Sequence, residues 1–234
     1  MLSNDHLRNS NQAALFQVDK VSASPEGYDL FLPVSFALCQ GDIIQVEGRN
    51  GVGKTTLLRL LAGISVVDSG GIIWKQHSIY RVRQEFYRCS CFISHEPAVQ
   101  EHLTSLENLQ WRLGLKGEIY RRDQLLEALV AAGIESCQDV IGSVLSEGQR
   151  RRTALASLML SQAQLWILDE PYTALDSGGV DWLTACIRKF LSGGGIVIVT
   201  SHQSLSSYFP IIKTIRLEHH QKTQQAHLES GYGG

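Results

Sequence analysis

Short, strongly apolar runs alternate along the chain with longer stretches whose apolar residues recur at helical spacing. Runs of strand length lie at residues 43–46, 165–168 and 196–199, and helical patterns follow the first two at 55–64 and 178–192. Strands that are apolar at successive positions are typical of a parallel sheet buried on both faces. The pattern therefore predicts an α/β fold in which helices cover each side of a parallel sheet.

Two regions depart from this pattern. Apolar residues alternate imperfectly with polar ones at 15–38, with a break at "SPEG", which indicates short antiparallel strands. From about residue 96 to 160 the segments "LTSLENLQWRLG" and "RRDQLLEALVAAG" show helical spacing and end in glycine. We expect a domain at 14–218 containing a mostly helical subdomain at about 96–160, a flexible extension at 1–13 and a flexible tail at 219–234.

Charge and composition exclude several classes of function. The 234 residues carry a net charge of −2 with a pI near 6.4, so no overall positive field favours nucleic acid as a partner. The apolar runs are far shorter than the roughly 20 residues that span a bilayer, and the first residues lack the pattern of a secretion signal. We therefore expect a cytoplasmic protein whose role at any membrane depends on a partner.

The segment "GRNGVGKTT" at 48–56 matches the phosphate-loop pattern G-x-x-x-x-G-K-[ST]. It follows a predicted strand and precedes a predicted helix, a context that favours a nucleotide site over a glycine turn without a ligand. Lys54 is expected to reach the terminal phosphates and the Thr55 hydroxyl to bind Mg²⁺. The expected nucleotide-binding residues of this segment are Gly48, Arg49, Asn50, Gly51, Val52, Gly53, Lys54, Thr55 and Thr56.

Two adjacent carboxylates, Asp169 and Glu170, follow the apolar run at 165–168. Such a pair is costly to desolvate unless a cation or a proton transfer requires it, so Asp169 is predicted to bind Mg²⁺ and Glu170 to accept a proton from an attacking water. His202 ends the next apolar run, where a parallel sheet presents its ligand-binding edge, and is predicted to contact the γ-phosphate. The alternative for the two carboxylates is a surface turn that contains Pro171 after the strand. The alternative for His202 is a histidine with a structural role in a loop.

The segment "VLSEGQRRR" at 144–152 contains the elements of a helix start. Ser146 and Gln149 have the spacing of a capping box. Three arginines close to the positive end of a helix dipole are unfavourable, however, unless another interaction stabilises them. The segment is therefore either a helix start alone or part of a site that binds an anion.

Taken together, these motifs resemble those of the ABC ATPase family from about residue 15 to 212. The phosphate loop, "LSEGQ", "LWILDE", the "ALD" that ends at Asp176, and His202 occur in the order of that family. Within the family, "LTSLENL", "LSEGQRRR", "LWILDEPYTALDSGGV" and "TSHQSL" resemble the haem exporter ATPases of cytochrome c maturation. Two positions depart from the general pattern: His95 replaces a glutamine, as this branch tends to show, and Glu147 replaces a glycine.

The resemblance implies a P-loop NTPase fold of RecA-like type, with an N-terminal antiparallel β subdomain and a helical insertion. It also implies a head-to-tail homodimer that binds ATP and Mg²⁺ between its subunits, with Ser146, Gly148 and Gln149 acting on the nucleotide of the partner. Asp176 would link the two sites, and the coupling residue His95 begins a segment that, with the helical insertion, would transmit the motion to membrane subunits. Whether His95 itself contacts Mg²⁺ or water, as the glutamine of the family does, stays open. Tyr28 is the expected adenine-stacking residue, with Phe31 and Phe16 as alternatives, although each could instead be a core aromatic.

By resemblance, the chain is an ATP-hydrolysing subunit on the cytoplasmic side of the inner membrane, where it would assemble peripherally with integral membrane subunits. It would couple hydrolysis to haem export or to release of a haem-loaded chaperone in cytochrome c biogenesis. Alternatives are an ABC transporter subunit for another cargo and a soluble non-transport ABC ATPase, which usually needs two fused cassettes or a coiled coil. A plain nucleotide-binding regulator would lack Glu170 and the signature.

Overall fold

A computed structural model of the chain describes residues 14–24 and 29–219. The predicted extension at 1–13, the adenine-stacking candidate Tyr28, and the predicted tail beyond His219 lie outside the described residues. Within them, no helix is long and apolar enough to cross a membrane.

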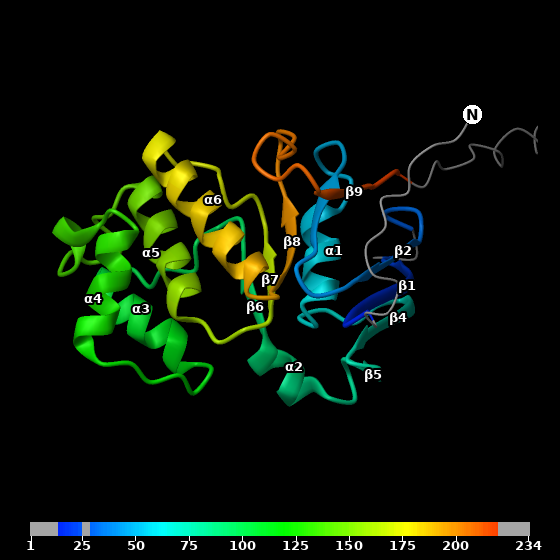
Figure 1. The fold of residues 1–234 in the computed structure, drawn as a ribbon, viewed down its shortest axis with the longest axis horizontal. Coiled ribbons are helices and arrows are strands. Elements are labelled where there is room, and N and C mark those ends of the chain that lie inside the picture. Colours follow the sequence, from blue (N-terminus) through cyan, green and yellow to red (C-terminus); the bar gives the residue numbers. More distant parts are fainter. Residues whose placement is uncertain (1–13, 25–28, 220–234) are drawn as a thin grey trace, which may run out of the picture.

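A five-stranded parallel sheet forms the centre of the molecule, in the order β6-β7-β8-β3-β9 (Figure 1). Its strands are β3 (Ile43–Glu47), β6 (Ser90–Ile93), β7 (Leu165–Leu168), β8 (Ile196–Thr200) and β9 (Lys213–Arg216). Residues of β7 and β8 are buried throughout, as their apolar runs predict. The edge strand β9 was not predicted, because its residues are mainly polar and exposed.

Helices cover both faces of this sheet. Side chains alternate across β7, so Leu165 and Ile167 join the cluster around α1 (Lys54–Leu61), whereas Trp166 and Leu168 face the other side. There α5 (Glu147–Leu160) and α6 (Ser177–Ser192) supply the covering residues. The Trp166 ring stacks on that of Phe190 with centroids 3.8 Å apart, which fixes α6 against the sheet.

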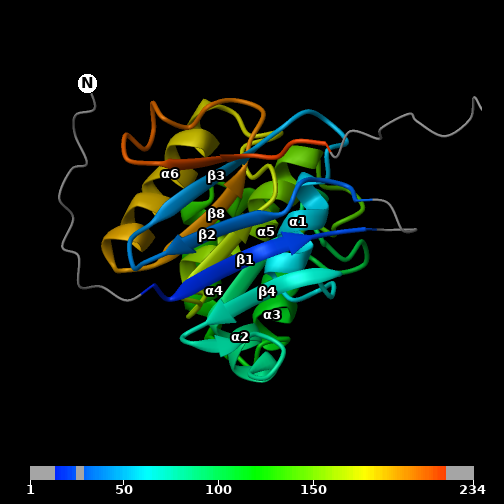
Figure 2. The same cartoon turned by 90° about the vertical axis from the view of Figure 1, so that its right-hand side faces the viewer.

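A second, antiparallel sheet packs on the outer side of α1 (Figure 2). Its order is β2-β1-β4-β5, formed by β1 (Phe16–Ser22), β2 (Val34–Leu38), β4 (Ser69–Trp74) and β5 (His77–Ser78). This confirms the antiparallel strands expected for the N-terminal segment. Phe16 and Phe31 are completely buried, so they are core aromatics and have no exposed ring face for an adenine.

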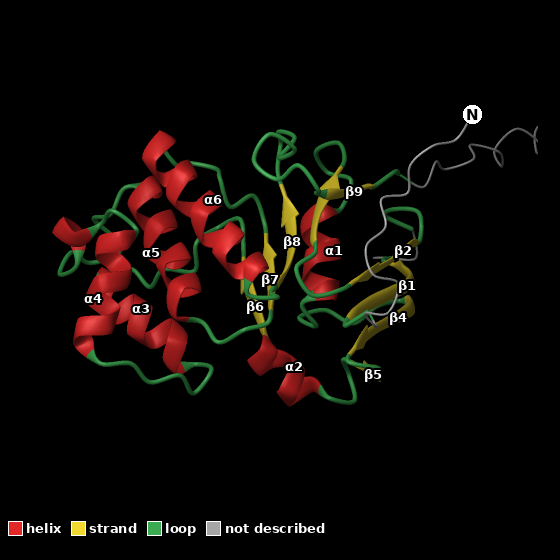
Figure 3. Cartoon of the chain, viewed as in Figure 1, coloured by secondary structure: helices red, strands yellow, loops and turns green. Residues whose placement is uncertain are grey.

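Helices dominate the segment for which the sequence predicts a helical subdomain (Figure 3). They are α3 (Ser105–Gly114), α4 (Arg122–Ala131), the 3-10 helix η2 (Glu135–Cys137) and α5, while α2 (Arg83–Cys89) precedes β6. Leu109, Leu129 and Ala156 belong to one apolar cluster shared by α3, α4 and α5. This cluster gives the helical segment a core of its own, and α5 also contacts the parallel sheet.

Candidate functional site

The loop between β3 and α1 has the backbone of a phosphate cradle. Gly53 precedes the helix with φ of 101°, and among residues 14–24 and 29–219 no side chain caps the helix start, so its first N–H groups are available to an anion. At Gly48 a Cβ atom would lie 2.8 Å from the Val52 side chain, which only glycine avoids. The Lys54 ammonium donates to the Gly48 carbonyl at 2.9 Å and thus lies across the loop.

The other residues of the predicted phosphate loop differ in their exposure to solvent. Arg49, Asn50, Gly51 and Thr55 are exposed, whereas Val52 is almost completely buried and anchors the loop to the core. Thr56 is half-buried in the first turn of α1. The polar side of the loop therefore faces the outside while its apolar side chain holds it to the core.

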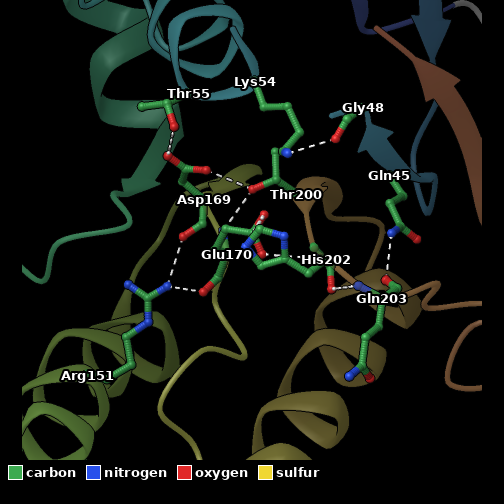
Figure 4. A network of polar contacts seen from close by, with 11 residues as sticks. Gln45, Gly48, Lys54, Thr55, Arg151, Asp169, Glu170, Thr200, His202 and Gln203 are labelled. Carbon is green, nitrogen blue, oxygen red and sulfur yellow. Dashed lines mark hydrogen bonds and ion pairs between the residues drawn. The ribbon is translucent and has the colours of Figure 1, made fainter. Parts of the chain in front are cut away.

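Asp169 lies directly after β7 and is buried at 1% exposure. Its two carboxylate oxygens have different donors: the Thr55 hydroxyl reaches Oδ2 at 2.7 Å, and the Thr200 hydroxyl reaches Oδ1 at 2.7 Å (Figure 4). One hydroxyl from α1 and one from β8 thus donate hydrogen bonds to the carboxylate that follows β7. The structure brings together Thr55 and Asp169, the two residues predicted to bind Mg²⁺.

Glu170 has an uncommon backbone conformation, with φ of +49°. The residue is 7% exposed, and Oε2 of its carboxylate accepts a hydrogen bond from the His202 main-chain N–H at 3.1 Å. The other oxygen, Oε1, is buried, accepts no hydrogen bond from the residues that the structure describes, and lies 3.8 Å from Nε2 of the exposed His202 ring. A buried carboxylate oxygen is costly when unpaired, so this atom is placed to accept a proton from a bound molecule.

The Thr55 hydroxyl and the Asp169 carboxylate are suitable ligands for a Mg²⁺ ion that is held mainly by phosphate oxygens. No group of three or more His, Cys, Asp or Glu side chains able to hold a metal ion occurs in the described part of the chain. A hydroxyl and a carboxylate are, however, the kind of oxygen ligands with which Mg²⁺ binds when substrate phosphates and water complete its octahedron. Thr55 and Asp169 therefore fit a metal that arrives with a nucleotide.

Two residues that support this site were not predicted from the sequence. Thr200 donates to Asp169 and also accepts from the Glu170 main-chain N–H at 2.8 Å. Gln45 is buried in β3 and binds the loop after His202 through the Gln203 carbonyl and the Leu205 N–H. For Gln45, the sequence shows only a single polar residue within an apolar run. That pattern could suggest a structural role but does not indicate which loop the side chain binds.

Helix α5 begins with the predicted capping box. The Ser146 N–H donates to Gln149 Oε1 at 2.9 Å, and the Gln149 N–H donates to Ser146 Oγ at 3.3 Å. Ser146 is exposed, and at Gly148 a Cβ atom would lie 2.8 Å from the Ala174 carbonyl oxygen. No hydrogen bond between described residues joins this helix start to the phosphate loop of the same chain.

The three arginines of α5 bind acceptors within their own chain, so no anion is needed to account for them. Arg150 donates to main-chain carbonyls before the helix. Arg151 donates to a set of buried carbonyls, and Arg152 pairs with Asp176. These acceptors offset the unfavourable helix dipole.

His95 and Asp176 occupy different surroundings. The His95 side chain is exposed, and its main-chain carbonyl accepts from Arg151 at 2.8 Å. Asp176 begins α6 and accepts from the Gly179 N–H at 2.8 Å, and this bond together with Arg152 lowers the pKa of the Asp176 carboxyl. Asp176 therefore stays ionised and joins α5 to α6.

Comparison with known proteins identifies the family. Residues 31–173 match the family model described as ABC transporter. The chain belongs to the ABC transporter family. The resemblance drawn from the phosphate loop, signature and acidic motifs is thus confirmed.

Similar proteins of this family cover most of the chain. The cytochrome c biogenesis ATP-binding export protein CcmA of Shigella flexneri is 44% identical over 192 residues, which are 80% of this chain and 89% of that protein. CcmA of Vibrio cholerae is 39% identical over 203 residues, covering 87% and 98%. A dimeric ATP-binding cassette in a post-hydrolysis state with ADP and Pi has a TM-score of 0.76 at 20% identity, covering 87% and 96%. The predicted P-loop fold of the ABC transporter family is therefore confirmed.

Proposed function

We propose that this chain is the ATP-hydrolysing subunit of an ABC transporter complex that serves cytochrome c biogenesis. The similar CcmA proteins, which are named cytochrome c biogenesis ATP-binding export proteins, support the assignment, because they match the chain over most of its length. The complex would export haem or release a haem-loaded chaperone. ATP is the proposed substrate, with hydrolysis to ADP and phosphate.

The proposed chemistry follows from the atoms that converge at the ends of β3, β7 and β8. Lys54 and the uncapped start of α1 bind the phosphates of ATP, and Thr55 and Asp169 hold Mg²⁺. Mg²⁺, when bound there, would neutralise part of the negative charge of the phosphates. Glu170 accepts a proton from the attacking water at Oε1, and His202 orients that water at the γ-phosphate.

The second half of each nucleotide site is proposed to come from another copy of the chain. No hydrogen bond between described residues joins Ser146, Gly148 or Gln149 to the phosphate loop of the same chain. Ser146 is exposed at the start of a helix, where backbone N–H groups favour anions. A twofold, head-to-tail homodimer would place this start against the partner's ATP. Asp176, which binds the same α5, would link the two sites.

We further propose that the assembly lies on the cytoplasmic side of the inner membrane and docks on integral membrane subunits. Residues 96–160 would form the subdomain that, with His95, transmits the motion of ATP binding to them. No role for nucleic acid is proposed. The exposed His95 side chain, carried by a loop whose backbone is bound to α5, supports a coupling role.

The observation that carries the proposal is the buried Glu170 Oε1, which accepts no hydrogen bond from the described residues, lies 3.8 Å from the His202 ring and follows an Asp169 already bound to Thr55. The test is to isolate the chain from native membranes, identify the bound proteins and measure ATP hydrolysis with and without a Mg²⁺ chelator. We expect cytochrome c assembly proteins in the isolate and hydrolysis that the chelator abolishes. Membrane subunits of an unrelated transporter would indicate another cargo, and absence of turnover would refute the ATPase assignment.

A further inference from the structure

Arg151 is a charged side chain buried in the middle of the structure. It lies on α5 and is 2% exposed. One guanidinium nitrogen, Nη1, donates to the Ser94 carbonyl at 2.7 Å and to the His95 carbonyl at 2.8 Å. Arg151 therefore joins α5 to the loop that follows β6.

The remaining nitrogens of Arg151 bind the loop that follows β7. Nη2 donates to the Asp169 carbonyl at 2.8 Å and to the Glu170 carbonyl (Figure 4). Nε donates to the Pro171 carbonyl at 3.4 Å. All three nitrogens thus bind main-chain oxygens of the two loops, and no carboxylate accepts a hydrogen bond from this group among the described residues.

Only arginine supplies this set of contacts. Its guanidinium presents five N–H donors in a rigid planar fork, whereas lysine has three donors on a single atom. Burial lowers the pKa of Arg151 to about 10, with the nearby Asp169 and Glu170 carboxylates favouring the charged form, so the group stays protonated at neutral pH. A buried cation of this kind is costly, and its contacts are all directed at the candidate catalytic loops.

The Glu170 peptide is the point where these contacts matter most. Its positive φ is uncommon for a residue other than glycine and costs free energy that the surroundings must offset. The Thr200 hydroxyl holds the Glu170 N–H, and Arg151 holds the Glu170 carbonyl. The direction of the Glu170 carboxylate follows from this backbone, so Arg151 acts on the proposed base without touching its reacting oxygen.

We propose that Arg151 is a positioning residue for hydrolysis, which holds the Glu170 and His95 peptides to the helix that begins with Ser146. This rests on the proposed ATPase function. Because α5 starts with the residues assigned to the partner's nucleotide, Arg151 makes the proposed base of one site move together with the signature that contacts the other. A displacement of α5 is thus transmitted to Glu170.

The test replaces Arg151 with alanine and then supplies the missing guanidinium group as a free ion in solution. In the assembled complex, Arg151→Ala should lower kcat by roughly 10- to 100-fold, the range for losing an outer partner of a catalytic site. The ATP dissociation constant should change by less than about threefold, because Arg151 makes no hydrogen bond to the described phosphate-loop residues and reaches Asp169 only at its main-chain carbonyl. Guanidinium chloride, at concentrations too low to unfold the protein, should restore part of kcat, and equal urea should not.

Two further variants keep the test decisive. Arg150→Ala removes a neighbouring guanidinium that binds the Gly142 and Ser143 carbonyls, and it should show no response to guanidinium. Arg151→Lys keeps the charge but not the fork, and should lower kcat even if Arg151→Ala does not fold. Wild-type kcat in Arg151→Lys, or a loss of kcat that only follows the unfolded fraction without guanidinium rescue, would overturn the proposal. A wild-type complex without turnover would instead refute the ATPase function.

Discussion

The Thr55 hydroxyl donates a hydrogen bond of 2.7 Å to Oδ2 of Asp169, across 114 positions of sequence. This bond joins the first turn of α1 to the carboxyl end of β7 and places two oxygen ligands side by side. In the free chain it also satisfies a carboxylate that is almost completely buried. The same pair therefore affects both the stability of the free chain and its affinity for Mg²⁺.

Thr55→Val should destabilise the nucleotide-free chain, because it leaves Asp169 Oδ2 without its donor while keeping the shape of the side chain. Loss of a hydrogen bond to a charged group costs roughly 1.5–3 kcal/mol. Urea unfolding measures the change, with Thr56→Val as the matched control in the same helical turn. An equal loss in both variants would show that the effect comes from the helix and not from Asp169.

Glu170→Gln should bind ATP as the wild type does and lose most turnover. The amide keeps an acceptor for the His202 N–H but cannot take a proton from water, and general-base catalysis contributes roughly 10²- to 10⁴-fold. Single-turnover hydrolysis and nucleotide binding separate the two effects. The control is Asp181→Asn, an exposed carboxylate on α6. Near-normal hydrolysis by Glu170→Gln would mean that another group is the base.

Local patterns in the sequence were sufficient to predict most of the architecture. The runs that form β7 and most of β8 are continuous and apolar, the run that forms most of β3 is interrupted only by Gln45, and the phosphate loop is a pattern of neighbouring residues. In contrast, β9 contains one apolar residue, Ile215, between polar ones, and it becomes a strand only by pairing with β3. The formation of β9 therefore depends on tertiary contacts, which the local spacing of apolar residues does not reveal.

The contacts that hold the candidate site are likewise non-local. Asp169 and Glu170 are recognisable from their place after an apolar run, but their partners are separated from them in sequence. Thr200 lies on a different strand, and Arg151 approaches from a helix that the sequence assigns to the signature. A buried arginine that binds only carbonyls has the same local sequence signal as an exposed one. The supporting residues could therefore be found only from the structure.

Stability should fall at alkaline pH through Tyr172. Burial raises the pKa of Tyr172 to about 12, so its folded-state pKa lies above the unfolded value of about 10. The folded state then holds this proton more tightly, and the stabilisation is complete below pH 10 and is lost as pH rises towards 12. Tyr172→Phe should therefore lose less stability than the wild type between pH 9 and about 11 in urea unfolding.

Cys186 provides the control for this pH dependence. Burial raises the pKa of its thiol to about 11, so Cys186 contributes a slope of the same sign in both proteins. Cys186→Ala in the Tyr172→Phe background should flatten the remaining dependence. If Tyr172→Phe and the wild type lose stability in parallel across this range, the Tyr172 hydroxyl does not hold its proton more tightly in the folded state.

Mixing two inactive variants distinguishes a nucleotide site shared between chains from one contained in a single chain. Lys54→Ala removes the phosphate contact of α1, and Ser146→Ala removes the exposed hydroxyl at the start of α5, where losing one preorganised donor costs roughly 2.7–4 kcal/mol. Each variant alone should hydrolyse ATP slowly. In a dimer of one copy of each, the intact Lys54 of one chain faces the intact Ser146 of the other.

An equimolar mixture that exchanges freely forms mixed dimers as about half of the total, each with one complete site, so about a quarter of all sites are restored under twofold symmetry. Hydrolysis in the reconstituted complex should rise towards that fraction as the copies exchange. A double variant carrying both substitutions, mixed with wild-type chains, is the matched control. Its mixed dimers carry the same two substitutions but have no complete site, so exchange should lower hydrolysis from about half to about a quarter of the wild-type value instead of raising it. If the first mixture stays as inactive as its components, Lys54 and Ser146 do not act across the dimer, and the head-to-tail arrangement is wrong.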